Sequence, residues 1–145
     1  EAGVHLEIVT NIIPNWNDSD AELNGLSQWI VENLGKSVPW HVTAYYPEYK
    51  LTEPPTPVAT LERAKKIGHQ NGLEYIYVGN IPGHPGQNTL CPECHKTLID
   101  RVSFGVGENH IVKGCCSFCG HKIDCYRGPD IPTRQHTTPF PKYIL

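Results

Sequence analysis

Apolar residues in the first eighty positions follow two spacings, one typical of strands and one typical of helices. Three short stretches rich in β-branched and aromatic residues, 4–13, 40–46 and 74–79, predict strands. Between them, apolar residues recur every three or four positions, which predicts two amphipathic helices. We therefore expect the order strand, helix, strand, helix, strand, which is typical of a parallel sheet with right-handed crossovers.

The ends of both predicted helices carry capping residues. Ser19, followed three positions later by Glu22, is a capping box for the first helix, and Gly35 is suited to end it. The second helix is expected to take Thr56 as its N-cap and Pro57 as its first helical residue. These signals limit each helix to the segment between two predicted strands.

Three parallel strands and two helices leave both edges of the sheet unpaired. Because parallel sheets are generally covered on both faces or closed into barrels, we expect residues 1–82 to form one sector of a larger (β/α) barrel. The alternative is a small three-stranded α/β domain whose edges are covered by the segment that follows. The Pro-rich residues 126–145 show no periodicity and are expected to be an extended tail.

Two C-x2-C pairs follow the third predicted strand, Cys91 with Cys94 and Cys116 with Cys119. Thiolates three positions apart on a tight turn can point at one ion, and a second such turn completes a tetrahedral site. This spacing is typical of a zinc ribbon, which we expect over residues 83–125. Four thiolates leave no open coordination position, so the Zn²⁺ ion is expected to be structural.

The residues between the two pairs predict a β-hairpin, with strands over 96–106 and 110–112 and the turn at 107–109. Disulfides among the six cysteines or a redox-active C-x-x-C are the other interpretations. Two pairs around a hairpin favour the closed metal site. The ligand set leaves iron open as the metal, and Cys115, beside Cys116, is a competing ligand.

Charge and hydropathy exclude some classes of partner. The net charge is −3 without a basic run, which argues against a nucleic-acid-binding surface. No apolar stretch approaches the roughly 18 residues that a membrane span requires. No apolar signal segment opens the chain, so a cytoplasmic location is expected. The chain has no Met and begins with Glu1, and we expect it to be processed, trimmed or part of something longer.

Several segments occur in an order that resembles one protein family. They are LEIVTNIIP (6–14), ND (17–18), PWHVT (39–43), TPV (56–58) with LE (61–62), and YIYVGN (75–80), followed by the paired cysteines. Together they resemble the carboxyl-terminal part of the radical SAM enzyme of the AmmeMemoRadiSam system, a relative of pyruvate formate-lyase activating enzymes. The likeness covers residues 3 to about 123.

The resemblance implies a fold and a chemistry. The fold would be the C-terminal sector of a (β/α) radical SAM barrel (βαβαβ) followed by a zinc-ribbon hairpin. The complete enzyme would bind a [4Fe–4S] cluster and S-adenosylmethionine, cleave the latter reductively and abstract a hydrogen atom through the 5′-deoxyadenosyl radical. The family's C-x3-C-x2-C cluster loop is absent from this sequence. We therefore expect a C-terminal half that is inactive alone, with the missing N-terminal half as partner and a protein as the candidate substrate.

The resemblance also suggests which residues meet the cofactor. The late strands of the family help to hold S-adenosylmethionine at their carboxyl ends, where this sequence has Asn11, Thr43, Tyr45 and Asn80. We expect these four to line the cofactor cavity, whereas His41 is equally well explained as a core imidazole. The alternative function is a free-standing zinc-ribbon module that binds a protein partner. A zinc hydrolase is weaker, because the chain has no H-E-x-x-H motif.

Overall fold

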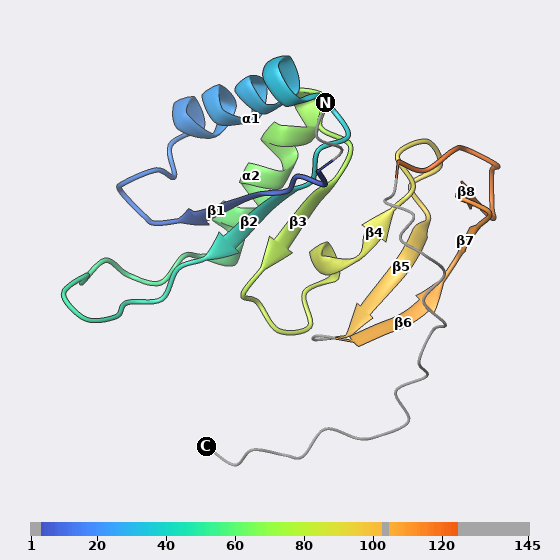
Figure 1. Cartoon of the computed structure of the whole chain (residues 1–145). Coiled ribbons are helices and arrows are strands. Elements are labelled where there is room, and N and C mark those ends of the chain that lie inside the picture. Colours follow the sequence, from blue (N-terminus) through green and yellow to red (C-terminus); the bar gives the residue numbers. More distant parts are fainter. Residues whose placement is uncertain (1–3, 103–104, 125–145) are drawn as a thin grey trace, which may run out of the picture.

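A computed structural model describes residues 4–102 and 105–124. Its first half contains, in chain order, β1 (Ile8–Ile12), α1 (Asp20–Leu34), β2 (Trp40–Ala44), α2 (Val58–Gln70) and β3 (Ile76–Gly79) (Figure 1). The three strands are parallel and lie in the order β1-β2-β3. Both helices pack on one face of this sheet, as right-handed crossovers between sequential strands require. Neither helix is long and apolar enough to cross a membrane.

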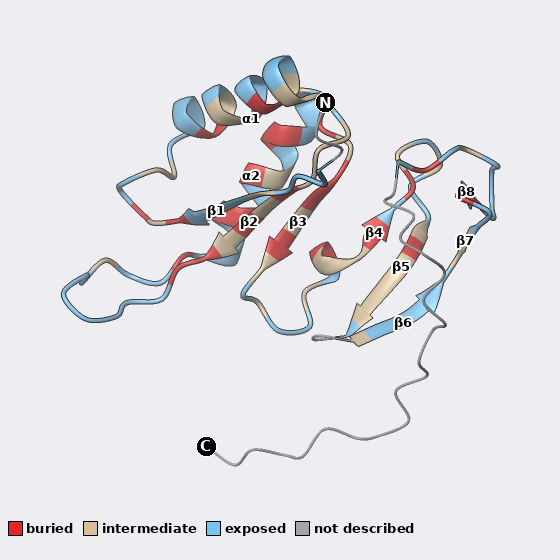
Figure 2. Ribbon diagram, in the orientation of Figure 1, coloured by how far each residue is buried: buried red, intermediate tan, exposed pale blue. Residues whose placement is uncertain are grey.

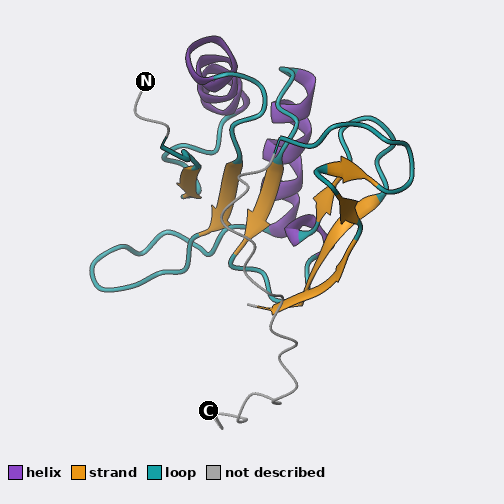
Figure 3. Ribbon diagram, turned by 45° about the vertical axis from the view of Figure 1, so that its right-hand side comes forward, coloured by secondary structure: helices purple, strands orange, loops and turns teal. Residues whose placement is uncertain are grey.

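The second half of the described chain forms two small antiparallel sheets. One sheet contains β4 (Thr89–Leu90), β5 (Thr97–Val102) and β6 (Gly105–Asn109), and the other contains β7 (Ile111–Val112) and β8 (Cys115–Cys116). A short 3-10 helix, η1 (Pro85–Gln87), leads from β3 to β4. Figures 1 and 3 both show these small sheets beside β3, away from β1.

The capping box predicted for α1 is confirmed. The N–H of Glu22 donates to the Ser19 hydroxyl, and the N–H of Ser19 donates to the Glu22 carboxylate, each at 3.3 Å. Gly35 ends the helix with φ 101°, a left-handed conformation that glycine adopts without a Cβ penalty. Its N–H donates to the carbonyls of Ile30 and Val31. Local sequence signals therefore set both ends of α1.

The N-cap predicted for α2 is wrong by one residue. Pro57 is the N-cap and the helix begins at Val58. The Thr56 hydroxyl does not cap the helix, because it accepts the N–H of Tyr45 at 2.8 Å and donates to the carbonyl of Ile12. Thr56 thus joins the carboxyl ends of β1 and β2 by tertiary hydrogen bonds.

The main core lies between the sheet and the two helices. Residues of β2 alternate between this core and the opposite face: Trp40, Val42 and Ala44 are buried, whereas His41 and Thr43 are only partly covered. The indole N–H of Trp40 donates to the Thr10 hydroxyl at 2.9 Å, which satisfies its polar atom inside the core. Figure 2 shows the buried positions concentrated where strands and helices face one another.

The expected (β/α) barrel sector is wrong. The parallel strands form an open three-stranded sheet with helices on one face, and small antiparallel sheets complete the described chain. The ribbon packs beside the edge strand β3, where the hydroxyl groups of Tyr77 and Thr89 lie within hydrogen-bond distance at 3.0 Å. In this respect the structure agrees with the alternative of a small α/β domain flanked by the ribbon. The other edge strand, β1, pairs only with β2 among the described residues.

The predicted hairpin turn is also wrong. Residues 107–109 lie within β6, and Asn109 pairs with Ile99 across an irregular register. Val102 at the end of β5 pairs with Gly105 at the start of β6 in antiparallel register. The tail expected over 126–145 lies outside the described residues, and the proposed boundary between residues 82 and 83 stays a prediction.

Two helical glycines allow the packing to be tested. A Cβ on Gly68 of α2 would lie 2.5 Å from Ile76 Cδ1 and 2.9 Å from Trp40 Cζ3, whereas a Cβ on Gly25 of α1 meets nothing within 4 Å. We expect Gly68→Ala to lower the free energy of unfolding by roughly 1–3 kcal/mol through overpacking. Gly25→Ala is expected to raise it by roughly 0.5–1 kcal/mol through helix propensity. Urea denaturation of both variants measures the difference, and equal effects would contradict this packing of α2.

Candidate functional site

Each C-x2-C pair lies on the same kind of tight turn. The N–H of His95 donates to the carbonyl of Cys91, and the N–H of Gly120 donates to the carbonyl of Cys116, both at 2.9 Å. The N–H of each first cysteine donates to the carbonyl five residues later, at 2.9 and 2.8 Å. Residues 95 and 120 are both left-handed, with φ 57° and 76°. The two turns are therefore structural repeats that present their cysteines in the same way.

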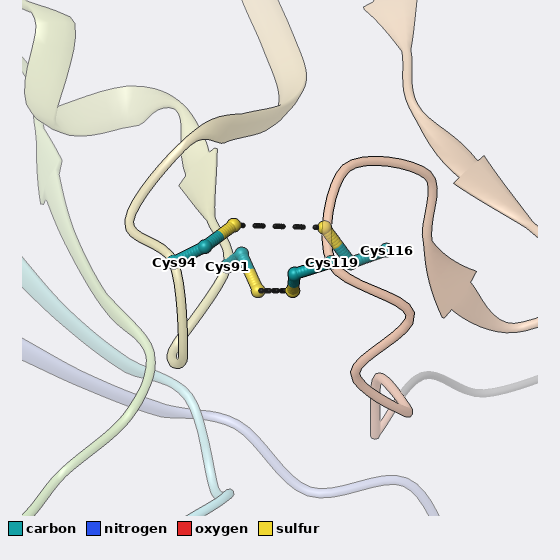
Figure 4. Close-up of side chains that lie close together, drawn as sticks. All are labelled: Cys91, Cys94, Cys116 and Cys119. Carbon is teal, nitrogen blue, oxygen red and sulfur yellow. Dashed lines mark hydrogen bonds between the residues drawn. The ribbon is translucent and has the colours of Figure 1, made fainter.

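The four sulfur atoms converge on one point between these turns (Figure 4). Sγ of Cys91 lies 3.7 Å from Sγ of Cys119, and Sγ of Cys94 lies 3.7 Å from Sγ of Cys116. All four lie within 4.8 Å of one another. Four thiolates about 2.3 Å from a zinc ion form a tetrahedron with edges of about 3.8 Å. These four cysteines are free thiols rather than disulfides and are close enough to bind a metal ion.

Burial differs across the cluster. Cys91 and Cys116 are buried, and they pack with Tyr75, Leu98 and Ile123 in a small apolar cluster. Cys94 is half-buried and Cys119 is exposed. One side of the cysteine cluster is therefore part of a hydrophobic core, while its other side faces solvent.

The thiols of the second turn have opposite pKa shifts. Burial raises the pKa of Cys116, but hydrogen bonds from the N–H groups of Cys119 and Phe118 outweigh it and lower this pKa to about 7. A backbone hydrogen bond from His121 lowers the pKa of Cys119, yet burial and the neighbouring thiols raise it to about 12. Without a cation, the cluster thus resists carrying several thiolates at once. A bound metal ion supplies the positive charge that stabilises them.

Cys115 does not join the cluster of four cysteines. It precedes Cys116 on β8, and neighbouring residues of a strand point to opposite faces. Its sulfur lies 4.0 Å from the carbonyl of Lys113 instead. The competing ligand that the sequence left open is therefore outside the cluster of four.

The structure brings two of the predicted cofactor residues together. Asn11 and Thr43 are register neighbours on β1 and β2, on the face away from the helices. The Thr43 hydroxyl lies 3.4 Å from Asn11 Oδ1 and also reaches the carbonyl of Thr10 at 3.3 Å. Gly79 follows in register on β3, and a Cβ there would lie 2.7 Å from Thr43 Cγ2. Glycine at this position therefore leaves room for the threonine side chain.

The other two predicted residues lie after β2 and β3. Asn80 has φ 61°, its side-chain amide donates to the carbonyl of Ala44 at 2.9 Å, and its own carbonyl accepts the Tyr46 hydroxyl at 3.0 Å. Asn80 thus joins the ends of two strands. Tyr45 is buried, and its hydroxyl has no hydrogen-bond partner within residues 4–102 and 105–124. A buried hydroxyl of this kind is uncommon.

Sequence reasoning missed a row of stacked side chains on the same open face. His41 donates to or accepts from Glu7 at 2.8 Å and stacks on Tyr77 with ring centroids 5.0 Å apart. The guanidinium carbon of Arg101 lies 5.1 Å from the Tyr77 ring centroid. Strand alternation places residues 7, 41 and 77 on one face and could have indicated the first three members. Arg101 comes from β5 and carried no such signal.

The Glu7 carboxylate is held in its charged form. A hydrogen bond from His5 lowers its pKa, burial raises it, and the charge of His41 lowers it again, so that the pKa lies below its usual value. His5 Nε2 lies 2.9 Å from Glu7 Oε1. Glu7 therefore bridges two imidazoles at the start of β1.

Comparison with known proteins gives one relative. No family model matches the chain, and no solved structure matches it. Over 125 residues the chain is 40% identical to the uncharacterized protein MJ0808 of the archaeon Methanocaldococcus jannaschii. The aligned region is 84% of this chain but 38% of the relative. The chain therefore spans about two fifths of the length of the curated protein that it matches.

The repeated turns generate a prediction about backbone conformation. A Cβ on Gly120 would meet nothing within 4 Å, so Gly120→Ala tests only the left-handed φ. We expect it to lower the free energy of unfolding of the metal-loaded chain by about 1 kcal/mol. The exposed His95 already carries a Cβ at the equivalent position, so His95→Gly is expected to be neutral or stabilising. Urea denaturation compares the two, and a destabilising His95→Gly would contradict the equivalence of the turns.

Proposed function

We propose that Cys91, Cys94, Cys116 and Cys119 hold one structural Zn²⁺ ion and that the residues around them form a zinc ribbon. The observation that carries this proposal is the convergence of four sulfurs from two matching turns. Four protein ligands close the coordination shell, so the ion contributes to folding rather than acting as a Lewis acid. Reduced thiols suit a reducing compartment, so a cytoplasmic location belongs to the same proposal.

Replacing a ligand tests the zinc site. We expect Cys91→Ser or Cys119→Ser to abolish stoichiometric zinc binding and to unfold residues 90–123, because structural zinc ribbons depend on their ion for folding. Cys115→Ser is the matched control and is expected to retain one zinc per chain. Elemental analysis measures the metal, and amide hydrogen exchange follows the folding of the ribbon. Unchanged zinc content in the Cys91 variant, or iron in place of zinc, would overturn the assignment.

We further propose that the chain contributes the carboxyl-terminal part of a radical SAM enzyme of the AmmeMemoRadiSam system. The name of the archaeal relative carries no activity, so the support comes from the order of the sequence motifs between residues 3 and 123. The greater length of that relative is compatible with further residues acting together with this part. This proposal is limited to the function and does not include the (β/α) barrel fold.

The residues on the open sheet face suit S-adenosylmethionine. Asn11 and Thr43 offer an amide and a hydroxyl side by side, and Tyr45 has a buried hydroxyl without a partner in the described chain. The cofactor's carboxylate, ribose hydroxyls and ring nitrogens match such groups. Asn80 would act indirectly, because its side-chain amide already holds the end of β2. When bound with a reduced [4Fe–4S] cluster, the cofactor supplies a 5′-deoxyadenosyl radical, and these residues would bind and orient it.

The cluster itself would depend on residues outside this chain. The sequence has no C-x3-C-x2-C motif, and the four ribbon cysteines lie together in their own cluster. We therefore propose that this chain binds zinc but no iron–sulfur cluster, and that radical chemistry requires the amino-terminal portion. The substrate class, including a protein substrate, stays a prediction.

Binding of S-adenosylmethionine tests the enzyme proposal. A longer protein, in which this chain is joined to an amino-terminal portion with a C-x3-C-x2-C motif and which is purified without oxygen, is expected to hold iron and sulfide and to release 5′-deoxyadenosine when reduced. Thr43→Val or Asn11→Ala is expected to weaken binding of S-adenosylmethionine roughly ten-fold, the equivalent of one hydrogen bond to a charged or polar group. Calorimetry measures the affinity, and chromatography measures the product.

The control is Asn33→Ala, which removes an exposed side-chain amide of α1 that donates to the Trp29 carbonyl. It is expected to bind the cofactor like the unmodified protein. Absence of iron from the longer protein, or unchanged binding in the Thr43 and Asn11 variants, would overturn the proposal. Neither result would affect the zinc site, whose test is separate.

A further inference from the structure

The metal centre and the parallel sheet share one apolar cluster. Tyr75, which precedes β3, is buried together with Cys91 and Cys116, two of the metal ligands. Tyr77 of β3 is partly buried and packs against the same cluster. Burial raises the pKa of Tyr75 to about 12, which agrees with a phenol enclosed by this packing. The position of β3 residues therefore depends on where the two turns hold their cysteines.

Arg101 adds a polar connection between the ribbon and β3. It lies on β5, and its guanidinium donates to the Thr89 hydroxyl at 2.6 Å and to the carbonyl of Gln87 at 3.1 Å. The Thr89 hydroxyl is also 3.0 Å from the hydroxyl of Tyr77. The same guanidinium lies against the Tyr77 ring, with a carbon-to-centroid distance of 5.1 Å. Arg101 thus contacts Tyr77 directly through the ring and indirectly through Thr89.

Thr89 is two residues before the first metal ligand. It belongs to β4, which pairs with β5, and it is buried. The turn at Cys91 therefore fixes one end of this pair of strands. The side-chain contact between Arg101 and Thr89 joins the two strands a short distance from that turn. Opening the turn would remove the support on which the Arg101 side chain rests.

The connection continues across the open face of the parallel sheet. Tyr77 and His41 are register neighbours, and their rings stack with an interplanar angle of 26°. His41 is held on its other side by Glu7 at 2.8 Å. Asn11 and Thr43 occupy the same face, two residues further along β1 and β2 from Val9 and His41. A change at Tyr77 would therefore reach the part of the face that carries the candidate cofactor residues.

We propose that metal binding in the ribbon fixes the arrangement of the open sheet face through Arg101, which positions the stacked pair of Tyr77 and His41. The ion fixes the two turns, and the turns keep Cys91 and Cys116 packed against Tyr75 and Tyr77. Arg101 then keeps the Tyr77 ring stacked on His41. Arg101 is a positioning residue and binds no metal. This inference rests on the proposed zinc site and is independent of the proposed enzyme.

The test follows the His41 ring by NMR of the full chain labelled at histidine, at one fixed pH. His41→Gln assigns the signal. Removal of zinc with a chelator is expected to shift the His41 ring protons, because stacking on Tyr77 places them in its ring current. Arg101→Ala, still loaded with one zinc per chain, is expected to shift the same protons in the same direction. The matched control is Arg63→Ala, which removes a guanidinium that pairs with Asp18 and Asp20 and is expected to leave the His41 signal unchanged.

A second variant covers the case in which Arg101→Ala loses its zinc. Thr89→Val keeps the buried shape but removes the hydroxyl that lies within hydrogen-bond distance of both Arg101 and Tyr77. It is expected to retain zinc and to shift the His41 protons by a smaller amount. Unchanged His41 signals after zinc removal, or in both zinc-loaded variants, would overturn the coupling while leaving the zinc site intact. A chain that binds no zinc would overturn both.

Discussion

The convergence of four cysteine sulfurs on one point is the constraint on which the second half of the described chain depends. Apart from β5 and β6, its strands are only two residues long, and such strands make few ladder hydrogen bonds. The apolar cluster that supports them contains two of the ligands themselves. A segment with so small a core needs a further constraint to fold, and the metal ion proposed above would supply it. The two turns have matching hydrogen bonds, so the same local structure presents each pair of cysteines to the site.

The first half follows a different principle, because it has a core of its own. Trp40, Ile12 and Leu23 are fully buried between the sheet and the helices. Ordinary apolar packing therefore holds this half without an ion. Its loops at the carboxyl edge are fixed instead by polar contacts such as those of Thr56 and Asn80, which join the ends of neighbouring strands. These contacts fix the carboxyl ends of the strands, next to the side chains of the open face.

Local signals in the sequence were sufficient for much of this structure. The periodicity and the capping box of Ser19 located α1, and the spacing of the cysteines indicated the metal centre, because both depend on residues a few positions apart. Thr56 misled the prediction of α2 because its hydroxyl bonds to residues 11 and 44 positions away. The barrel was wrong because the sequence shows that a strand edge lacks a partner but does not show what will pack beside it. The contact of Arg101 with Tyr77 likewise exists only in the folded chain.

The chemistry of the open sheet face distinguishes between two kinds of occupant. An apolar surface placed there would cover the exposed side chain of Val9, but it would also cover the polar groups of Asn11 and Thr43 and offer them no hydrogen bonds beyond those to each other and to the Thr10 carbonyl. Covering polar groups without new hydrogen bonds is costly. A small polar ligand with donors and acceptors of its own would pair with these groups. These two side chains therefore favour a ligand with hydrogen-bonding groups over an apolar surface at this part of the face, and the proposed cofactor is one ligand of that kind.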